Sequence, residues 1–241
     1  MNSGMPRRPR AFLPDVPVHL IQRGNNRQVC FYADQDYATY LDKLLESSRA
    51  CGVAIHSYVL MTNHVHLLCS PSTTDGVSSM MQGLGRYFVR YINATYDRSG
   101  TLWEGRFKVS MVNTEKYLLT VSRYIELNPV RARMVDHPVE YPWSSYRNNG
   151  AGVPIRLITH HPVYLRLGRS NSERQRRYRA LFDQEMPKLT LDQIRMAANK
   201  SWVLGDGHFK RQVEKQLGYR IPPLPRGGDR KSKLALHIRS T

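Results

Sequence analysis

The stretch 53–69, VAIHSYVLMTNHVHLLC, decides the fold predicted for this chain. Residues 53–61 and 65–69 are rich in β-branched and apolar side chains, and Thr62-Asn63 separates the two runs. Two such runs around a two-residue turn are typical of a β-hairpin. The sequence therefore predicts two antiparallel strands at this point, one after the other.

Patterns on both sides extend this hairpin. The side chains of the segment 19–25 alternate between two faces, and the segment closes at the turn Gly24-Asn25-Asn26, which is typical of a strand. Residues 107–112 form another short strand-like run. Apolar residues at helical spacing predict helices over 34–51, 75–96 and 114–127. The resulting order, β-α-β-β-α-β and a helix, predicts an α+β fold of the ferredoxin-like split βαβ type. We expect an antiparallel sheet with helices on one face, and a second face that meets a partner or another helix.

Composition limits the class of protein. The chain has 241 residues, 41% of them hydrophobic, and a net charge of +17. It can therefore build a core, and its basic charge favours a nucleic acid as partner over a membrane surface. We find no apolar run of about 18 residues and expect no membrane partner. The three cysteines lack CxxC spacing, and we expect reduced thiols in a cytoplasmic protein.

The positive charge is uneven along the chain. Residues 1–150 hold 17 Lys and Arg against 12 Asp and Glu, whereas residues 151–241 hold 19 against 7. A turn-rich stretch at 148–154 lies between them. We therefore expect a basic N-terminal arm (1–12), a catalytic domain (13–150) and a basic, mostly helical DNA-binding region (151–241). Helix-like stretches in the last region cover 171–182, 191–204 and 209–217.

The pair His64 and His66 is the sharpest chemical signal. Residues i and i+2 of a strand share a face, so the two imidazoles lie side by side while Val65 turns to the core. Two convergent imidazoles make half of a divalent-metal site. The alternative is a pair of sheet histidines bonded to their neighbours, and the spacing alone leaves both open.

Tyr124 and Asn128 are the second signal. They are four residues apart at the end of the helix predicted over 114–127, on one face with Tyr117 and Val121. A tyrosine near a metal can act as a nucleophile, and an amide oxygen can be a ligand. A core or surface aromatic is the alternative for any one of the 14 tyrosines.

These motifs carry a resemblance to a known family. His64-Val65-His66 resembles the HUH motif, and 123–132 (RYIELNPVRA) resembles the tyrosine segment of the single-tyrosine IS200/IS605 transposases. The segments 19–28 (HLIQRGNNRQ), 102–107 (LWEGRF) and the NPVRA run are similar to REP-associated tyrosine transposases, bacterial relatives linked to short palindromic repeats. The resemblance spans about residues 6 to 146 and agrees with the predicted fold.

The resemblance implies an enzyme and its site. His64 and His66 match the ligands of Mg²⁺ or Mn²⁺, and Tyr124 matches the nucleophile. Asn128 stands where IS200-type enzymes carry a glutamine that completes the metal site, and its side chain is one methylene shorter. The implied reaction is cleavage and rejoining of single-stranded, hairpin-forming DNA through a 5′-phosphotyrosine, by a monomer or homodimer at the bacterial nucleoid. A non-cleaving repeat-binding protein and a metal-dependent RNA or nucleotide hydrolase are the alternatives.

Basic and amide side chains along the first 150 residues are candidates for DNA contact. Three arginines between prolines form the N-terminal arm, four residues end the first strand, two lie at helical spacing, and two flank the fourth strand. They are Arg7, Arg8, Arg10, Arg23, Asn25, Asn26, Arg27, Arg86, Arg90, Arg106 and Lys108. A solvated surface is the alternative for the helical pair and the arm.

Overall fold

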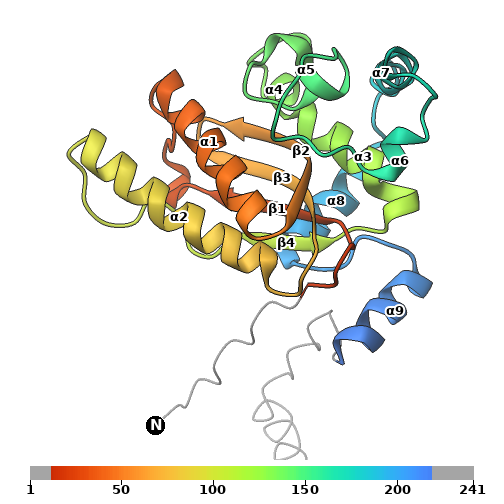
Figure 1. The fold of residues 1–241 in the computed structure, drawn as a ribbon, viewed down its shortest axis with the longest axis horizontal. Coiled ribbons are helices and arrows are strands. Elements are labelled where there is room, and N and C mark those ends of the chain that lie inside the picture. Colours follow the sequence, from red (N-terminus) through yellow and green to blue (C-terminus); the bar gives the residue numbers. More distant parts are fainter. Residues whose placement is uncertain (1–11, 219–241) are drawn as a thin grey trace, which may run out of the picture.

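A computed structural model describes residues 12–218, and four strands within it form one antiparallel sheet (Figure 1). The strands are β1 (Val18–Arg23), β2 (Val53–Met61), β3 (His64–Pro71) and β4 (Lys108–Met111), in the order β2-β3-β1-β4. Because β3 lies between β1 and β2 and is antiparallel to both, β1 and β2 run in the same direction. This is the predicted split βαβ arrangement.

Helices cover both faces of the sheet. Helices α1 (Asp34–Ala50) and α2 (Gly76–Thr95) pack on one face, and α3 (Thr114–Glu126) and α8 (Lys188–Lys200) pack on the other (Figure 1). The remaining elements are η1 (Asn25–Arg27), α4 (Asn128–Arg131), η2 (Pro138–Glu140), α5 (Tyr146–Asn149), α6 (Pro162–Leu165), α7 (Asn171–Ala180) and α9 (Gly207–Leu217). The α+β class is confirmed. The second face, expected to meet a partner or another helix, is covered by α3 and α8.

Strand alternation divides the buried residues into two main clusters. On β3, Val65, Leu67 and Cys69 join the cluster under α1 and α2, whereas Leu68 joins the cluster under α3. A register shift in β2 at His56 keeps this alternation in phase along the hairpin. Each face of the sheet therefore has its own core.

Segments after residue 150 take part in these cores. Leu204 pairs with Val112 beside β4, and Ile158 pairs with Ile55 of β2. Ile194 of α8 is fully buried in the cluster under α3. The two sides of residue 150 are therefore packed together, and the division into regions stays a prediction about function.

The C-terminal boundary of one predicted helix was wrong. We expected a helix over 191–204, but α8 ends at Lys200, and Ser201 adopts a left-handed conformation with φ of 53°. Leu204 is instead extended and donates its backbone N–H to Met111 O at 2.8 Å. Pairing beside β4 thus competes successfully with the last helical turn. In the part of the chain that the structure describes, no helix is long and apolar enough to cross a membrane.

Candidate active site

His64 and His66 lie on the face of β3 that α3 covers. Their neighbours across the sheet are Arg23 and Ile21 of β1, on the same face. The two imidazole centroids are 5.0 Å apart, and His66 is buried whereas His64 is partly exposed. The predicted side-by-side placement is therefore present in the structure.

Each imidazole is held through its Nδ1 atom. His64 Nδ1 lies 2.6 Å from Asn63 Oδ1, and His66 Nδ1 lies 2.9 Å from His19 Nε2. The His19 ring also stacks on His66, with centroids 5.1 Å apart. A metal-binding histidine commonly engages its second ring nitrogen in this way, so that the first keeps a fixed direction. The geometry leaves Nε2 of both residues for a ligand.

Burial keeps these imidazoles neutral. It lowers the pKa of His19 to about 3. Burial, followed by the charge of Arg23, lowers the pKa of His64 to about 4. The pKa of His66 lies well below its usual value, mainly because of burial and then because of the nearby charges of His19, His64 and Arg131. Neutral imidazoles at pH 7 present the lone pairs that a metal requires.

Tyr124 of α3 lies over this cluster. Its ring meets His19 and His66 edge to face, with centroid distances of 5.8 and 5.9 Å. The Arg131 guanidinium stands 4.4 Å from the Tyr124 ring centroid and donates a hydrogen bond to Tyr124 O. The structure thus brings the predicted tyrosine and the predicted histidines together.

Asn128 follows α3 and is half-buried. Its Nδ2 donates to Tyr124 O and Ile125 O, both at 3.1 Å. These bonds commit the amide nitrogen to the end of the helix, so only Oδ1 remains for a ligand. Within residues 12–218, no group of three His, Cys, Asp or Glu side chains is arranged to hold a metal. A third protein ligand beside the two histidines would therefore have to be an uncharged group such as this amide.

A buried carboxyl positions the helix that carries the tyrosine. Glu126 accepts hydrogen bonds from Ser145 Oγ (2.5 Å), Tyr178 Oη (2.8 Å), Asn149 Nδ2 (2.9 Å) and Ser57 Oγ (3.2 Å). These donors come from β2, from the segment after η2, and from α7. Burial raises the pKa of Glu126 to about 7, although all four donors favour the charged form. The network fixes α3 against both the sheet and the C-terminal region.

Several predicted DNA contacts gather at the Arg23 end of β1. Arg23, Arg106 and Lys108 line a cavity of about 110 Å³ with Glu104 and Asn199. The turn η1, which holds Asn25, Asn26 and Arg27, follows β1 directly, and Asn63 Nδ2 donates to Arg27 O at 3.0 Å. Asn63 therefore joins this basic turn to His64.

Other predicted contacts lie elsewhere. Arg86 and Arg90 are exposed on α2, across the sheet from the histidines. Arg7, Arg8 and Arg10 lie outside the described residues. The adjacent His160 and His161 form local contacts: His160 Nε2 lies 2.9 Å from Asn148 Oδ1, and His161 Nδ1 accepts from the N–H of Val163 at 3.1 Å.

Sequence reasoning missed roles for His19 and Arg131. His19 was predicted on the first strand, but its contact with His66 depends on the register between β1 and β3, which has no local signature. Nδ1 of His19 and Nη1 of Arg131 are buried and have no hydrogen-bond partner among the described residues. A buried N–H without a protein partner is uncommon, and a water molecule or an anion would satisfy Arg131 Nη1.

The sheet, the histidine pair and the tyrosine helix agree with a family-level match. Residues 13–128 match the family model described as "Transposase IS200 like". The matched segment contains β1–β4 and ends at Asn128, so it holds the two histidines and Tyr124. This segment belongs to the IS200-like transposase family, as its motifs predicted.

Nine chains of solved structures match this chain, among them the following two. One, described as a REP-associated tyrosine transposase bound to a REP hairpin, has 18% identity and a TM-score of 0.53, and the match covers 65% of this chain and 93% of that one. At this identity the likeness shows the fold. The other, described as a transposase from Deinococcus radiodurans R1, has 20% identity and a TM-score of 0.36, covering 50% and 95% of the two chains. No curated protein matches the chain.

Proposed function

We propose that this protein is a metal-dependent endonuclease and strand transferase that cleaves single-stranded DNA at palindromic, hairpin-forming repeats. The observation that carries this proposal is the placement of Tyr124 over the His19–His66 pair, with centroids 5.8 and 5.9 Å away. An ordinary core tyrosine does not require neighbours such as His64 and His66, whose Nδ1 atoms are engaged and whose Nε2 atoms remain for a ligand. Family membership of residues 13–128 supports a transposase, and the fold shared with a protein described as bound to a REP hairpin supports hairpin DNA.

The residues present fit a hard divalent cation. His64 and His66 would hold it through Nε2, and Asn128 Oδ1 is the candidate third ligand. Imidazole, amide oxygen and water suit Mg²⁺ or Mn²⁺, whereas structural zinc sites use more Cys and His ligands. When bound, such an ion polarises a phosphoryl oxygen and stabilises the charge that develops on it.

The chain's own residues divide the remaining work. Tyr124 Oη forms the bond to phosphorus, the bond from phosphorus to O3′ breaks, and the phenolic proton is balanced by protonation of O3′. The products are a 5′-phosphotyrosine and a free 3′-hydroxyl. Attack by another 3′-hydroxyl reverses the step and releases the tyrosine, so strands are rejoined without an external energy source. Arg131, beside the tyrosine ring, is placed to neutralise negative charge on the phosphate or phenolate.

The DNA is held by basic side chains on more than one element. Arg23, Arg27, Arg106 and Lys108 are placed to bind phosphates close to the site, and the arginines of α7 add positive charge in the C-terminal region. The histidines and the tyrosine come from the same chain, so a monomer can build the whole site. A homodimer is the other possible arrangement, and sedimentation distinguishes the two. This substrate places the protein at the nucleoid in the bacterial cytoplasm.

The decisive experiment uses labelled, hairpin-bearing single-stranded DNA with Mg²⁺ or Mn²⁺ on a denaturing gel. Wild-type protein should form a denaturation-resistant adduct with the 5′ end of the product. Tyr124→Phe removes one oxygen and little volume, so it should keep folding and DNA binding but lose the adduct and the cleavage. The matched control is Tyr117→Phe, on the same helix, which should keep both.

Each of the other outcomes would assign the protein a different function. Cleavage without an adduct indicates a hydrolase that uses water, and binding without cleavage indicates a non-cleaving repeat-binding protein. If Tyr124→Phe still forms the adduct, another tyrosine is the nucleophile.

A further inference from the structure

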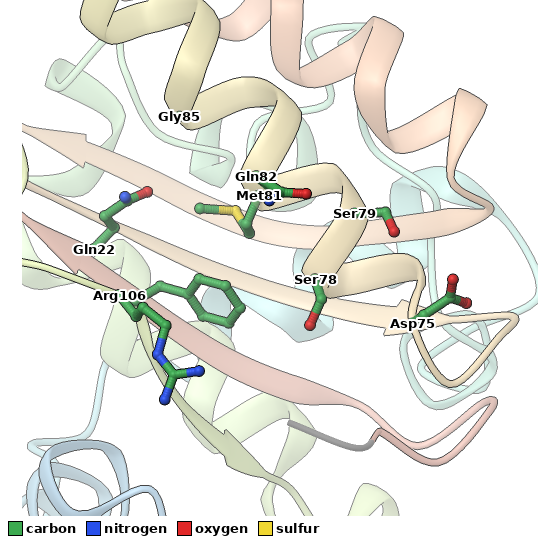
Figure 2. A pocket seen from close by; sticks show the side chains of 9 residues that line it. Gln22, Asp75, Ser78, Ser79, Met81, Gln82, Gly85 and Arg106 are labelled. Atoms are coloured by element: carbon green, nitrogen blue, oxygen red, sulfur yellow. The ribbon is translucent and has the colours of Figure 1, made fainter. Parts of the chain in front are cut away.

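A second cavity lies on the opposite side of the sheet from the histidines. It has a volume of about 510 Å³ and lies between the first turns of α2, the strand β1 and the two residues that precede β4. Figure 2 shows Ser78, Gln82 and Gly85 along α2, with Gln22 and Arg106 on the strand side. Cavities that bind small organic groups span about 300–1,000 Å³, so this one has a suitable size.

The inner end of this cavity carries an unpartnered amide. Gln22 points to the α2 face because it alternates with Arg23, and only 7% of the residue is exposed. Its Oε1 is buried and has no hydrogen-bond partner among the described residues, and the same holds for Nε1 of Trp103. Both side chains lie beside Gly85, where an added Cβ would stand 4.0 Å from Gln22 Nε2 and 3.9 Å from Trp103 Nε1. Gln22 and Trp103 thus each keep one buried polar atom without a partner near Gly85, the acceptor Oε1 and the donor Nε1.

Arg106 connects this cavity with the active-site side of the sheet. It lines the 510 Å³ cavity and also the 110 Å³ cavity that contains Arg23 and Lys108. Arg106 precedes β4, the last strand in the sheet order, so a nucleic-acid chain that passes Arg106 would reach both cavities. A phosphate bound by Arg106 would then leave its own nucleotide next to α2.

We propose that the cavity receives the base of one unpaired nucleotide in the DNA strand that leads to the active site, and that Gln22 reads the hydrogen-bonding edge of that base. This inference rests on the proposed function, since it requires a single-stranded DNA substrate. An amide side chain offers both an acceptor and a donor, as base recognition requires.

The lining favours a base over a phosphate. Asp75 lies at one end of the cavity, so a second negative charge inside it is disfavoured. Met81 and Phe107 give apolar walls, and Ser78 and Gln82 add neutral polar groups. A flat, uncharged heterocycle matches these walls, while the phosphate stays outside at Arg106.

Equilibrium binding of the full chain to hairpin DNA tests this proposal. The DNA carries a single-stranded flank in which each nucleotide in turn is replaced by an abasic site. Gly85→Leu adds an apolar side chain at the cavity wall on α2, and its Cβ makes only ordinary contacts. The matched control is Gly83→Leu, two residues away, where an added Cβ meets nothing within 4 Å.

One abasic position should weaken wild-type binding about ten-fold, the scale expected for one stacked base. Gly85→Leu should weaken binding of intact DNA by a similar factor and lose nothing more at that abasic position. Gly83→Leu should match wild type, and Gln22→Leu should reduce discrimination among the four bases there.

The proposal is overturned if no flank position couples to Gly85→Leu, or if the two losses simply multiply. Adduct formation on the same DNA separates this result from the proposed function. Coupling without an adduct leaves the base site and rejects the nuclease, whereas an adduct without coupling rejects the base site alone.

Discussion

The two faces of the sheet use the same strands for different purposes. Under α1 and α2, most of the buried residues are aliphatic or aromatic, as in the contact of Phe88 with Tyr40 at 5.0 Å, and Gln22 is a polar exception. Under α3, the strands present His19, His64 and His66, with burial that lowers the pKa of each. A strand's period of two lets one segment contribute to both. The comparison teaches that neighbouring residues on one strand can be substituted to change either the free energy of unfolding or the chemistry of the site.

Two residues of β3 give the largest expected difference between the faces. His64→Ala removes one of the paired imidazoles from a partly exposed position, so adduct formation should fall below detection while hairpin binding and the free energy of unfolding change little. Leu67→Ala should instead lower the free energy of unfolding by about 2–5 kcal/mol, because Leu67 is fully buried on the other face. The adduct assay and urea denaturation measure the two effects.

Metal removal is the control for that comparison. Chelator should act on wild-type protein as His64→Ala does, and added Mn²⁺ should restore wild type alone. Full adduct formation in excess chelator would show that the imidazoles serve another purpose.

Arg131 sharpens the comparison on the histidine side. Burial lowers the pKa of Arg131 to about 10, so the guanidinium is still charged at pH 7, and its Nη1 has no partner among the described residues. Arg131→Gln should slow adduct formation by about 10²–10³-fold, the usual loss for one oriented donor to a transition state. Single-turnover rates at saturating DNA measure this loss.

The matched control is Arg133→Asn, an exposed position at φ of 56° where asparagine is tolerated. It should leave the rate unchanged. If both variants lost the same rate of adduct formation, the effect would come from the lower net positive charge and not from the position of Arg131.

Local patterns were sufficient for part of this molecule. The hairpin around Thr62-Asn63 and the placement of His64 and His66 on one face both follow from a period of two, and the structure contains both. Helical spacing likewise placed Tyr124 and Asn128 together at the end of α3. Such features depend on neighbours within a few residues, which a sequence records directly.

Other features depend on distant pairing. The contact of His19 with His66 spans 47 positions and requires the observed strand register. The packing of α8 over the sheet, and the bond from Tyr178 to Glu126 across 52 positions, likewise depend on docking of the C-terminal region. No short-range pattern encodes these contacts. The sequence therefore predicted that the helices exist but not where they pack on the sheet.

His19 offers a smaller effect through His66. His19→Phe keeps an aromatic ring but removes the Nε2 acceptor, so the His66 ring loses its orientation. Loss of such a partner commonly lowers metal affinity by about 10–100-fold. We expect a higher Mn²⁺ concentration for half-maximal adduct formation, with the rate at saturating Mn²⁺ and hairpin binding nearly unchanged. His19→Gln, which can still accept a hydrogen bond, should recover part of the affinity. A Mn²⁺ requirement equal to that of wild type in His19→Phe would contradict this role.

The smallest effect concerns the two cysteines buried on the α1–α2 face, Cys30 and Cys69. Burial raises the pKa of Cys69 to about 12, and burial outweighs the charge of Arg98 to raise the pKa of Cys30 to about 12. An acid whose pKa is raised ionises only at higher pH, so at pH 8 about one in ten thousand of these thiols is the reactive thiolate. Cys51 is partly exposed. A thiol reagent at pH 8 should therefore label one cysteine per native chain and all three in denaturant. Raising the pH to 9 should not make a second thiol reactive, because pH 9 is still far below the pKa of about 12 of Cys30 and Cys69. Rapid labelling of Cys69 in the native protein would show that this face opens to solvent, and the separation between a structural face and a chemical face would fail there.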